Sequence, residues 1–199
     1  MIHFSGRCRL AFGLTAAILA IALPGRAKVA EPTVSGLLKL ANVVVIGKVL
    51  RVRKFAREPV AEVKVLTNIR GVTAGQTVYV HVGKTWACDA SHAKTGETLA
   101  LLLVPWTPRP SSSLPMEPGQ EFANAFHGQH PGQQIYRIGW HGLGRLRTKS
   151  IRGKLLINAP YAEGPSVQTG ARNRALPGWI TVEQLRRLAE RHPLPGANR

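Results

Sequence analysis

The apolar positions of this chain form short runs and alternations that are typical of β-strands. The strongest signal lies at residues 42–55, where the β-branched run 43–46 is followed by valines alternating with cations. We expect the first part of this strand to be buried on both faces, because no polar residue interrupts it. The second part should have one wet, basic face.

Three further strands are predicted at residues 61–69, 77–82 and 98–104, with Pro105 ending the last one. Short turns join the four strands, and this spacing favours a compact antiparallel barrel over alternating strands and helices. The predicted fold is therefore mainly β, a small antiparallel barrel with a core at 35–104. A short helical turn is expected at residues 34–41, before the first strand.

The remainder of the chain is expected to add three pieces to this barrel. A proline-rich excursion at 105–132 crosses the barrel surface, and a late hairpin follows at 135–158, with a bend at the glycines of residues 142–144. A C-terminal helix is predicted at 181–191, because Thr181 and Gln184 have the spacing of a capping box.

The first residues have the pattern of a secretory signal peptide. Two arginines precede a short apolar stretch, and small residues occupy the positions that a signal peptidase reads before Lys28. We therefore expect residues 1–27 to be removed and residues 28–199 to form one β-barrel domain. The mature protein would be exported, either to the periplasm or to the medium.

The charge of the chain is strongly positive, and the expected cleavage leaves it so. The full chain has 27 basic and 10 acidic residues, and three of the basic residues precede Lys28, which leaves a net charge of +14. Such a field favours anionic partners: an envelope polymer, a protein, or lipid headgroups in a peripheral membrane contact. Export argues against genomic nucleic acid, and the pattern does not predict the oligomeric state.

Cysteine usage indicates a fold that does not depend on disulfides. Cys8 would leave with the signal peptide, and Cys88 would remain without an intramolecular partner. We expect Cys88 to be packed and unreactive. Pairing with another chain and a reactive thiol remain the alternatives.

Several segments together resemble the netrin-like module, an OB-type barrel shared with tissue inhibitors of metalloproteinases. The resemblance rests on Cys88 and on four stretches, namely residues 41–49, 63–71, 75–80 and 96–104. It implies an OB-type fold for residues 35–104. Those inhibitors bind the protease zinc through an N-terminal cysteine, whereas this mature chain would begin with Lys28. A protease-inhibitor-like protein without that cysteine is therefore one alternative function.

Catalytic and metal-binding motifs are sparse. His127 and His130 lie on what reads as a Gly/Pro loop and supply two ligands at most, so no metal or other cofactor is expected. Cys88 and His92 could form a nucleophile and base, which keeps a thiol- or metal-dependent envelope enzyme open as an alternative. We expect no enzyme, because the usual hydrolase and nucleotide-binding motifs are missing.

Basic residues concentrate on the first strand and on the late hairpin, with Trp140 among them. OB-type barrels bind linear polymers through basic and aromatic side chains on a strand face. The sequence therefore predicts an exported, non-catalytic binding module for an anionic polymer or a protein partner. The candidate ligand-binding residues are Lys48, Arg51, Arg53, Arg137, Trp140, Arg145, Arg147 and Lys149.

Overall fold

A computed structural model describes residues 33–83, 91–107, 119–140, 142–159, 167–169, 174–176 and 178–194. The expected signal peptide and Cys88 lie outside these residues. The helices are α2 (Val34–Leu40), α3 (Gln120–Gln129) and α4 (Val182–Glu190). The strands are β1 (Val43–Phe55), β2 (Glu58–Arg70), β3 (Thr77–His81), β4 (Thr98–Pro105), β5 (Ile135–Ile138), β6 (Arg145–Ile151), β7 (Lys154–Asn158), β8 (Val167–Thr169), β9 (Arg174–Leu176) and β10 (Trp179–Thr181). None of the described helices has the length and apolar character needed to cross a bilayer.

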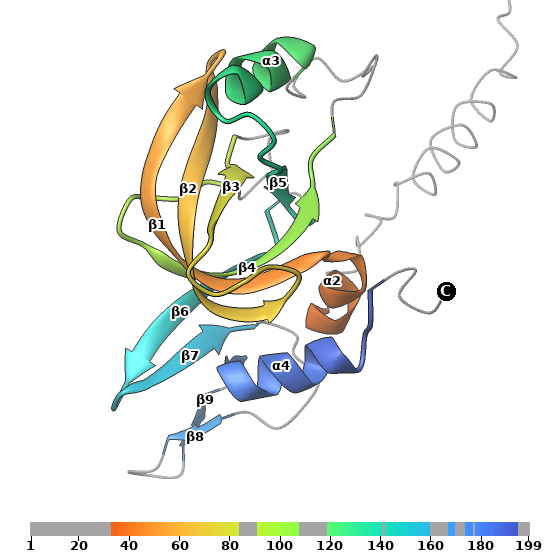
Figure 1. Cartoon of the computed structure of the whole chain (residues 1–199). Helices are drawn as coiled ribbons and strands as arrows, with labels where there is room; N and C mark the ends of the chain where they lie inside the picture. Colours follow the sequence, from red (N-terminus) through yellow and green to blue (C-terminus); the bar gives the residue numbers. More distant parts are fainter. Residues whose placement is uncertain are drawn as a thin grey trace, which may run out of the picture. The chain divides into compact units, whose positions relative to one another are not determined.

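Five strands close into a small barrel, which confirms the predicted mainly-β barrel (Figure 1). The strand order is β1-β2-β3-β5-β4, and β4 returns to pair with β1. All pairings within the barrel are antiparallel except that of β3 with β5. The order and the single parallel pair are compatible with an OB-like barrel.

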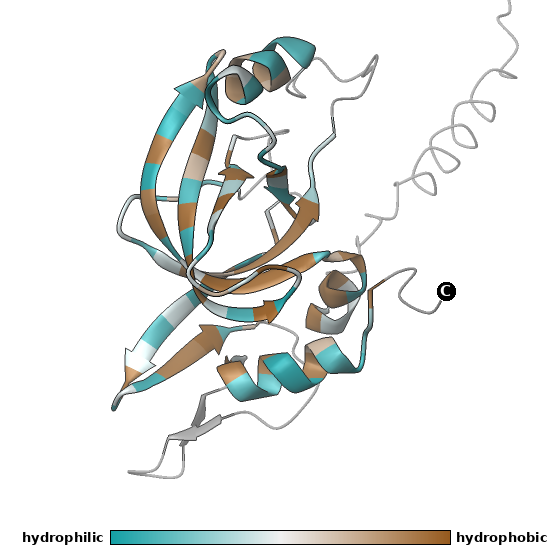
Figure 2. Ribbon diagram, viewed as in Figure 1, coloured by the Kyte–Doolittle hydropathy of each residue, from teal (hydrophilic) through white to brown (hydrophobic). Residues whose placement is uncertain are grey.

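The two apolar strands β1 and β4 lie between two separate cores. Val45 and Leu101 face the barrel interior, whereas Ile46 and Leu102 face an outer core that α2 and α4 cover. This confirms the expectation that the first part of β1 is buried on both faces. Figure 2 shows that β4 and β7 are apolar, whereas β6 between them is more polar.

The long strands β1 and β2 bend around the barrel at three register shifts. Each shift leaves one extra residue unpaired, as in a β-bulge, and increases the local twist. The extra residues are Leu50 on β1 and Leu66 and Ile69 on β2. At Gly47 a Cβ atom would lie 2.3 Å from Cγ1 of Val63, so the absence of a side chain leaves room for Val63 in the barrel interior.

Helix α4 begins as its sequence predicts. The Thr181 side chain accepts a hydrogen bond from the Gln184 backbone N–H at 3.1 Å, and the Gln184 side chain accepts one from the Thr181 N–H at 2.8 Å. This reciprocal pair is the capping box. Ile180 and Leu185 on either side of the cap are both buried in the outer core, which anchors the helix to the barrel.

Arg70, the last residue of β2, joins the C-terminal ends of two helices. Its guanidinium donates to the carbonyls of Leu38 (3.0 Å) and Ala41 (3.1 Å) at the end of α2, and to those of Ala189 and His192 at the end of α4. The last carbonyls of a helix have no partner within the helix and carry partial negative charge. Partial burial lowers the pKa of Arg70 below its ordinary value.

Helix α3 corrects the prediction of an irregular excursion at 105–132. Its residues Phe122 and Phe126 are buried against the outer face of β2 and β3, where they meet Tyr79 and Trp106. The N-cap residue of the helix is Gly119, which has no side chain and therefore gives no capping signal in the sequence. The apolar stripe of the helix also contains few aliphatic residues. The i, i+4 spacing of the two phenylalanines was the available signal.

The late hairpin is divided differently from the prediction. Residues 135–158 were expected to form one hairpin with a bend, whereas they form β5, a turn at residues 139–140 and 142–144, β6 and β7. Strand β5 pairs with β3 and β4 and so closes the barrel, while β6 and β7 form the predicted hairpin around Arg152 and Gly153. The expected bend at 142–144 is confirmed as part of the turn.

Tyr136 on β5 is expected to make the stability of the barrel sensitive to alkaline pH. Burial raises the pKa of its phenol above the ordinary value. Because the pKa is higher in the folded state, the neutral phenol's contribution is complete below about pH 10 and is lost as the pH rises through the folded-state pKa. We expect the free energy of urea unfolding to fall above pH 10, and to fall less steeply in Tyr136→Phe. An equal slope in both proteins would contradict this assignment.

Candidate functional site

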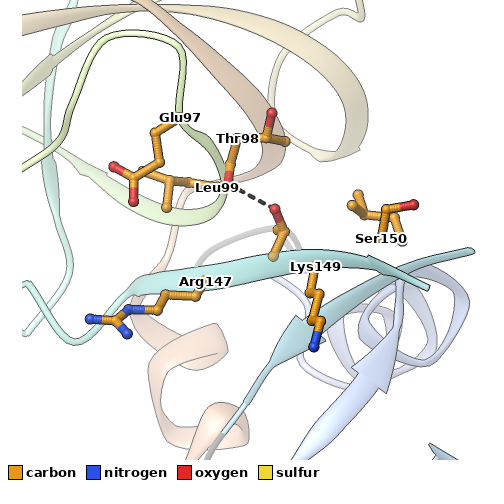
Figure 3. A pocket seen from close by; sticks show the side chains of 8 residues that line it. Glu97, Thr98, Leu99, Arg147, Lys149 and Ser150 are labelled. Atoms are coloured by element: carbon orange, nitrogen blue, oxygen red, sulfur yellow. Dashed lines mark hydrogen bonds between the residues drawn. The ribbon is translucent and has the colours of Figure 1, made fainter.

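A groove opens where β6 separates from β4. The ladder between these strands runs from Leu101–Arg145 to Leu99–Arg147 and ends there. At the next position the Thr148 hydroxyl donates to the Thr98 carbonyl at 2.7 Å (Figure 3). Beyond this bond the strands diverge, because β4 begins at Thr98 whereas β6 continues into its hairpin with β7.

We call this opening the β6 groove; it has a volume of about 410 Å³. Its lining residues are Glu97, Thr98, Leu99, Arg147, Thr148, Lys149, Ser150 and Leu155. The Thr148 side chain is directed toward Thr98, to whose carbonyl it donates. Figure 3 shows the side chains of Arg147 and Lys149 leaving the face of β6 opposite to that of Ser150. The groove is therefore bordered by hydroxyl groups on one side of the strand and by cations on the other.

The charge at the β6 groove is positive because Glu97, the acidic residue of its described lining, is already paired with an arginine. Glu97 forms an ion pair with Arg145, whose side chain is only 8% exposed, and it also accepts a hydrogen bond from the Lys94 backbone N–H at 3.1 Å. Within the described part of the chain, the exposed side chains of Arg147 and Lys149 have no ionic partner. These two cations are available to an anionic ligand.

The predicted basic cluster on β1 is partly neutralised. Arg51 lies 2.8 Å from a Glu62 carboxylate oxygen and Arg53 lies 3.7 Å from the other. The hydrogen bond that Arg51 donates to Glu62, together with the charge of that carboxylate, raises the pKa of Arg51. Lys48 is exposed and lies opposite Lys64 on β2 and Thr98 on β4. Of this cluster, Lys48 is thus the predicted site residue whose strand position is nearest to the β6 groove.

The other two predicted residues lie outside the groove lining. Arg137 is exposed on β5, and Trp140 is 45% exposed in the turn that follows, with a backbone φ of +51°. Both ends of this turn are fixed to Leu102, which accepts from the Gly139 N–H and donates to the Gly144 carbonyl. Of the eight predicted residues, Arg147 and Lys149 therefore line the groove, and Arg145 is bound to Glu97 in the groove lining.

The predicted histidine loop is in fact helical. His127 lies on α3 and is exposed, whereas His130 ends α3 and stacks on Phe126 with ring centroids 5.0 Å apart. His130 also packs against Tyr79 at 4.6 Å, and its Nε2 atom is buried without a hydrogen-bond partner in the described residues. His130 therefore packs against the aromatic rings of Phe55, Tyr79 and Phe126.

A second histidine pairs with a carboxylate in the same region. His81 on β3 is almost fully buried, with Nε2 2.8 Å from Glu58 Oε2, and its ring lies against Phe122. A Cβ atom on Gly83 would lie within 2.7 Å of this imidazole. Among the residues that the structure describes, no three His, Cys, Asp or Glu side chains converge as metal ligands. His92 is exposed, while Cys88 and His141 lie outside the described residues.

The hydroxyl side of the β6 groove had not been identified from the sequence. Thr98, Thr148 and Ser150 have no unusual spacing, and they come together only because two distant segments meet. The one available signal was the alternation of hydroxyl and cationic residues along 147–150.

No protein-family model matches this chain, and no curated protein matches it either.

Proposed function

We propose that this protein is an exported, non-catalytic binding module that holds an anionic polymer at the β6 groove. The observation that carries the proposal is the concentration of unpaired charge there: Arg147 and Lys149 border a groove in which Glu97, the one acidic residue among the described lining residues, is held by Arg145. Backbone and hydroxyl groups of Thr98, Thr148 and Ser150 supply hydrogen-bonding positions beside these cations. Residues 1–27, with their signal-peptide pattern, support export.

We also propose that the barrel is a simplified netrin-like module. Its strand order and its parallel β3–β5 pair support an OB-type barrel. No metal-chelating N-terminal cysteine accompanies the barrel in this sequence. Nothing on the described residues favours the thiol-dependent or metal-dependent enzyme over the binding module, because the buried His81–Glu58 pair lies under α3.

The proposal is tested by reversing the two groove cations. The double variant R147E/K149E should bind dextran sulfate about 30–100-fold more weakly than the wild type at low salt, since each surface cation contributes on the order of 1 kcal/mol to an anionic surface. The slope of log affinity against log salt should also decrease by about two, because two fewer counterions are released. Fluorescence titration at several salt concentrations measures both quantities.

A matched control is available at the other end of the barrel. Lys54 and Arg57 are exposed at the β1–β2 tip beside α3, far from the β6–β7 hairpin (Figure 1). The variant K54E/R57E changes the net charge equally and should lose less than threefold in affinity. Equal losses in both variants would mean general attraction without a site, and failure of the wild type to bind at low salt would remove the proposal.

A further inference from the structure

The part of β6 that borders the groove is an open strand edge. The Gly144 carbonyl accepts from the Leu102 N–H, so Gly144 directs its backbone groups toward β4. Backbone direction alternates along an antiparallel strand, so Thr148 and Ser150 direct theirs to the same side. Thr148 lies opposite Thr98 and is bound to it, which leaves Ser150 as the residue beyond the ladder. The β4 ladder ends at Leu99–Arg147, and in the described part of the chain no strand pairs with β6 beyond that position on this side.

The pairing of β6 with β7 also indicates that Ser150 directs its backbone groups to the open edge. Strands β6 and β7 are joined by a two-residue turn, Arg152–Gly153, in which both residues have positive φ (51° and 75°). In such a hairpin the flanking residues, Ile151 and Lys154, exchange backbone hydrogen bonds. By alternation Ser150 does not bond to β7, which leaves its N–H and C=O directed to the open edge.

The side chains along this edge also alternate. Arg147 and Lys149 lie on one face of β6, while Thr148 and Ser150 lie on the other. Leu155 of β7 lies opposite Ser150 and is partly buried against the outer core. A strand placed beside this edge would therefore meet cations on one of its faces and a hydroxyl and apolar surface on its other face.

We propose that the β6 groove binds an extended polypeptide whose acidic residues alternate with apolar ones, and that this peptide adds a strand to β6 beyond Thr148, where it pairs with Ser150. The inference rests on the proposed function and names the class of its partner. An extended peptide matches the open edge because it presents both N–H donors and C=O acceptors, whereas a sulfated polysaccharide presents mainly acceptors. With 10 acidic residues in 199, the chain itself is a poor source of this peptide, so the partner is another protein.

The decisive experiment compares a synthetic peptide of alternating glutamate and valine with the same peptide N-methylated on every backbone amide. Charge and side chains are unchanged, but the methylated peptide cannot donate to a strand edge. Wild-type protein should bind the unmodified peptide at least tenfold more tightly by fluorescence anisotropy. Equal binding of the two peptides overturns the inference, and no variant of the protein is needed for this comparison.

Ser150→Pro provides the complementary change on the protein. Proline removes the one backbone N–H that faces the open edge and leaves the bonds to β7 in place. The variant should lose at least tenfold in affinity for the peptide and retain its affinity for dextran sulfate, whereas Ser150→Ala should retain both. Undiminished peptide binding by Ser150→Pro contradicts strand addition.

The two ligands separate the inference from the proposed function. If dextran sulfate binds with the expected dependence on Arg147 and Lys149 but the peptide does not bind, strand addition is wrong and the anionic-polymer proposal stands. If neither ligand binds at low salt, both are wrong.

Discussion

Replacing Arg70 with methionine is expected to lower the free energy of unfolding by about 3 kcal/mol, because helix-end carbonyls of both α2 and α4 would lose a charged donor. Hydrogen bonds to charged groups are stronger than neutral ones, and a carbonyl left partly buried without a partner is costly. Methionine keeps most of the length and apolar stem of the side chain, so the loss reports mainly on the guanidinium. Urea unfolding monitored by circular dichroism measures it.

Two variants show whether the effect belongs to the joint between the helices. Arg70→Lys should give an intermediate loss, since one ammonium group cannot reach all four carbonyls in the fork geometry of a guanidinium. Arg186→Ala removes an exposed cation of α4 that lies 3.9 Å from Glu183, and should cost less than about 0.5 kcal/mol. A loss below 1 kcal/mol in Arg70→Met would mean that apolar packing alone holds α2 and α4.

Gly144→Ala is expected to destabilise the protein by about 2–3 kcal/mol. A Cβ atom at this position would lie 2.6 Å from the Leu102 carbonyl oxygen and 3.2 Å from the Gly139 nitrogen, and both of these are backbone atoms. The β4 edge must therefore shift away from the turn, which breaks the bonds that hold the start of β6 against β4. Thermal and urea unfolding measure the loss.

Gly128→Ala is a control variant that should raise the stability of the protein. Gly128 lies on the exposed side of α3, where an added Cβ would meet nothing within 4 Å. Alanine favours the helix over glycine, so this variant should be more stable by about 0.5–1 kcal/mol. If both alanine variants had the same effect, the close approach of Gly144 to Leu102 would not be the cause.

The position of Gly144 links stability to the proposed site. The turn at 139–144 places β5 and β6 on the same edge of β4, so β5 can close the barrel while β6 leaves it. The β6 groove exists because β6 extends beyond the first residue of β4. A variant that separates the turn from Leu102 should therefore weaken ligand binding as well as folding.

Local patterns in the sequence were sufficient for most of the strands and for one helix. The period of two along β1 and β3, the unbroken apolar run of β4 and the capping box of α4 each depend on neighbouring residues only. Such signals follow from backbone geometry and survive in any tertiary context. The same is true of the β6–β7 hairpin, whose turn needs Gly153 in the left-handed region.

Helix α3 shows where local patterns were insufficient. Its sequence has weak helical propensity and no side-chain cap, so its own residues favour a helix only slightly. Phe122 and Phe126 become buried because β2 and β3 offer Val60 and Tyr79 as an apolar outer face. The helix is thus stabilised mainly by packing, which a single sequence does not reveal.

The sequence by itself determined the mainly-β fold, the two-sided burial of the first part of β1, the capping box that begins the C-terminal helix, and the excess of basic residues. The tertiary structure decided that β5 closes the barrel and that Arg70 joins two helix ends. It also decided that Glu62 and Glu97 neutralise some cations, while Arg147 and Lys149 have no acidic partner among the described residues. The reason is the range of each interaction. Strand period and capping act over a few residues, whereas Glu97 and Arg145 are 48 residues apart and meet only because β6 pairs with β4.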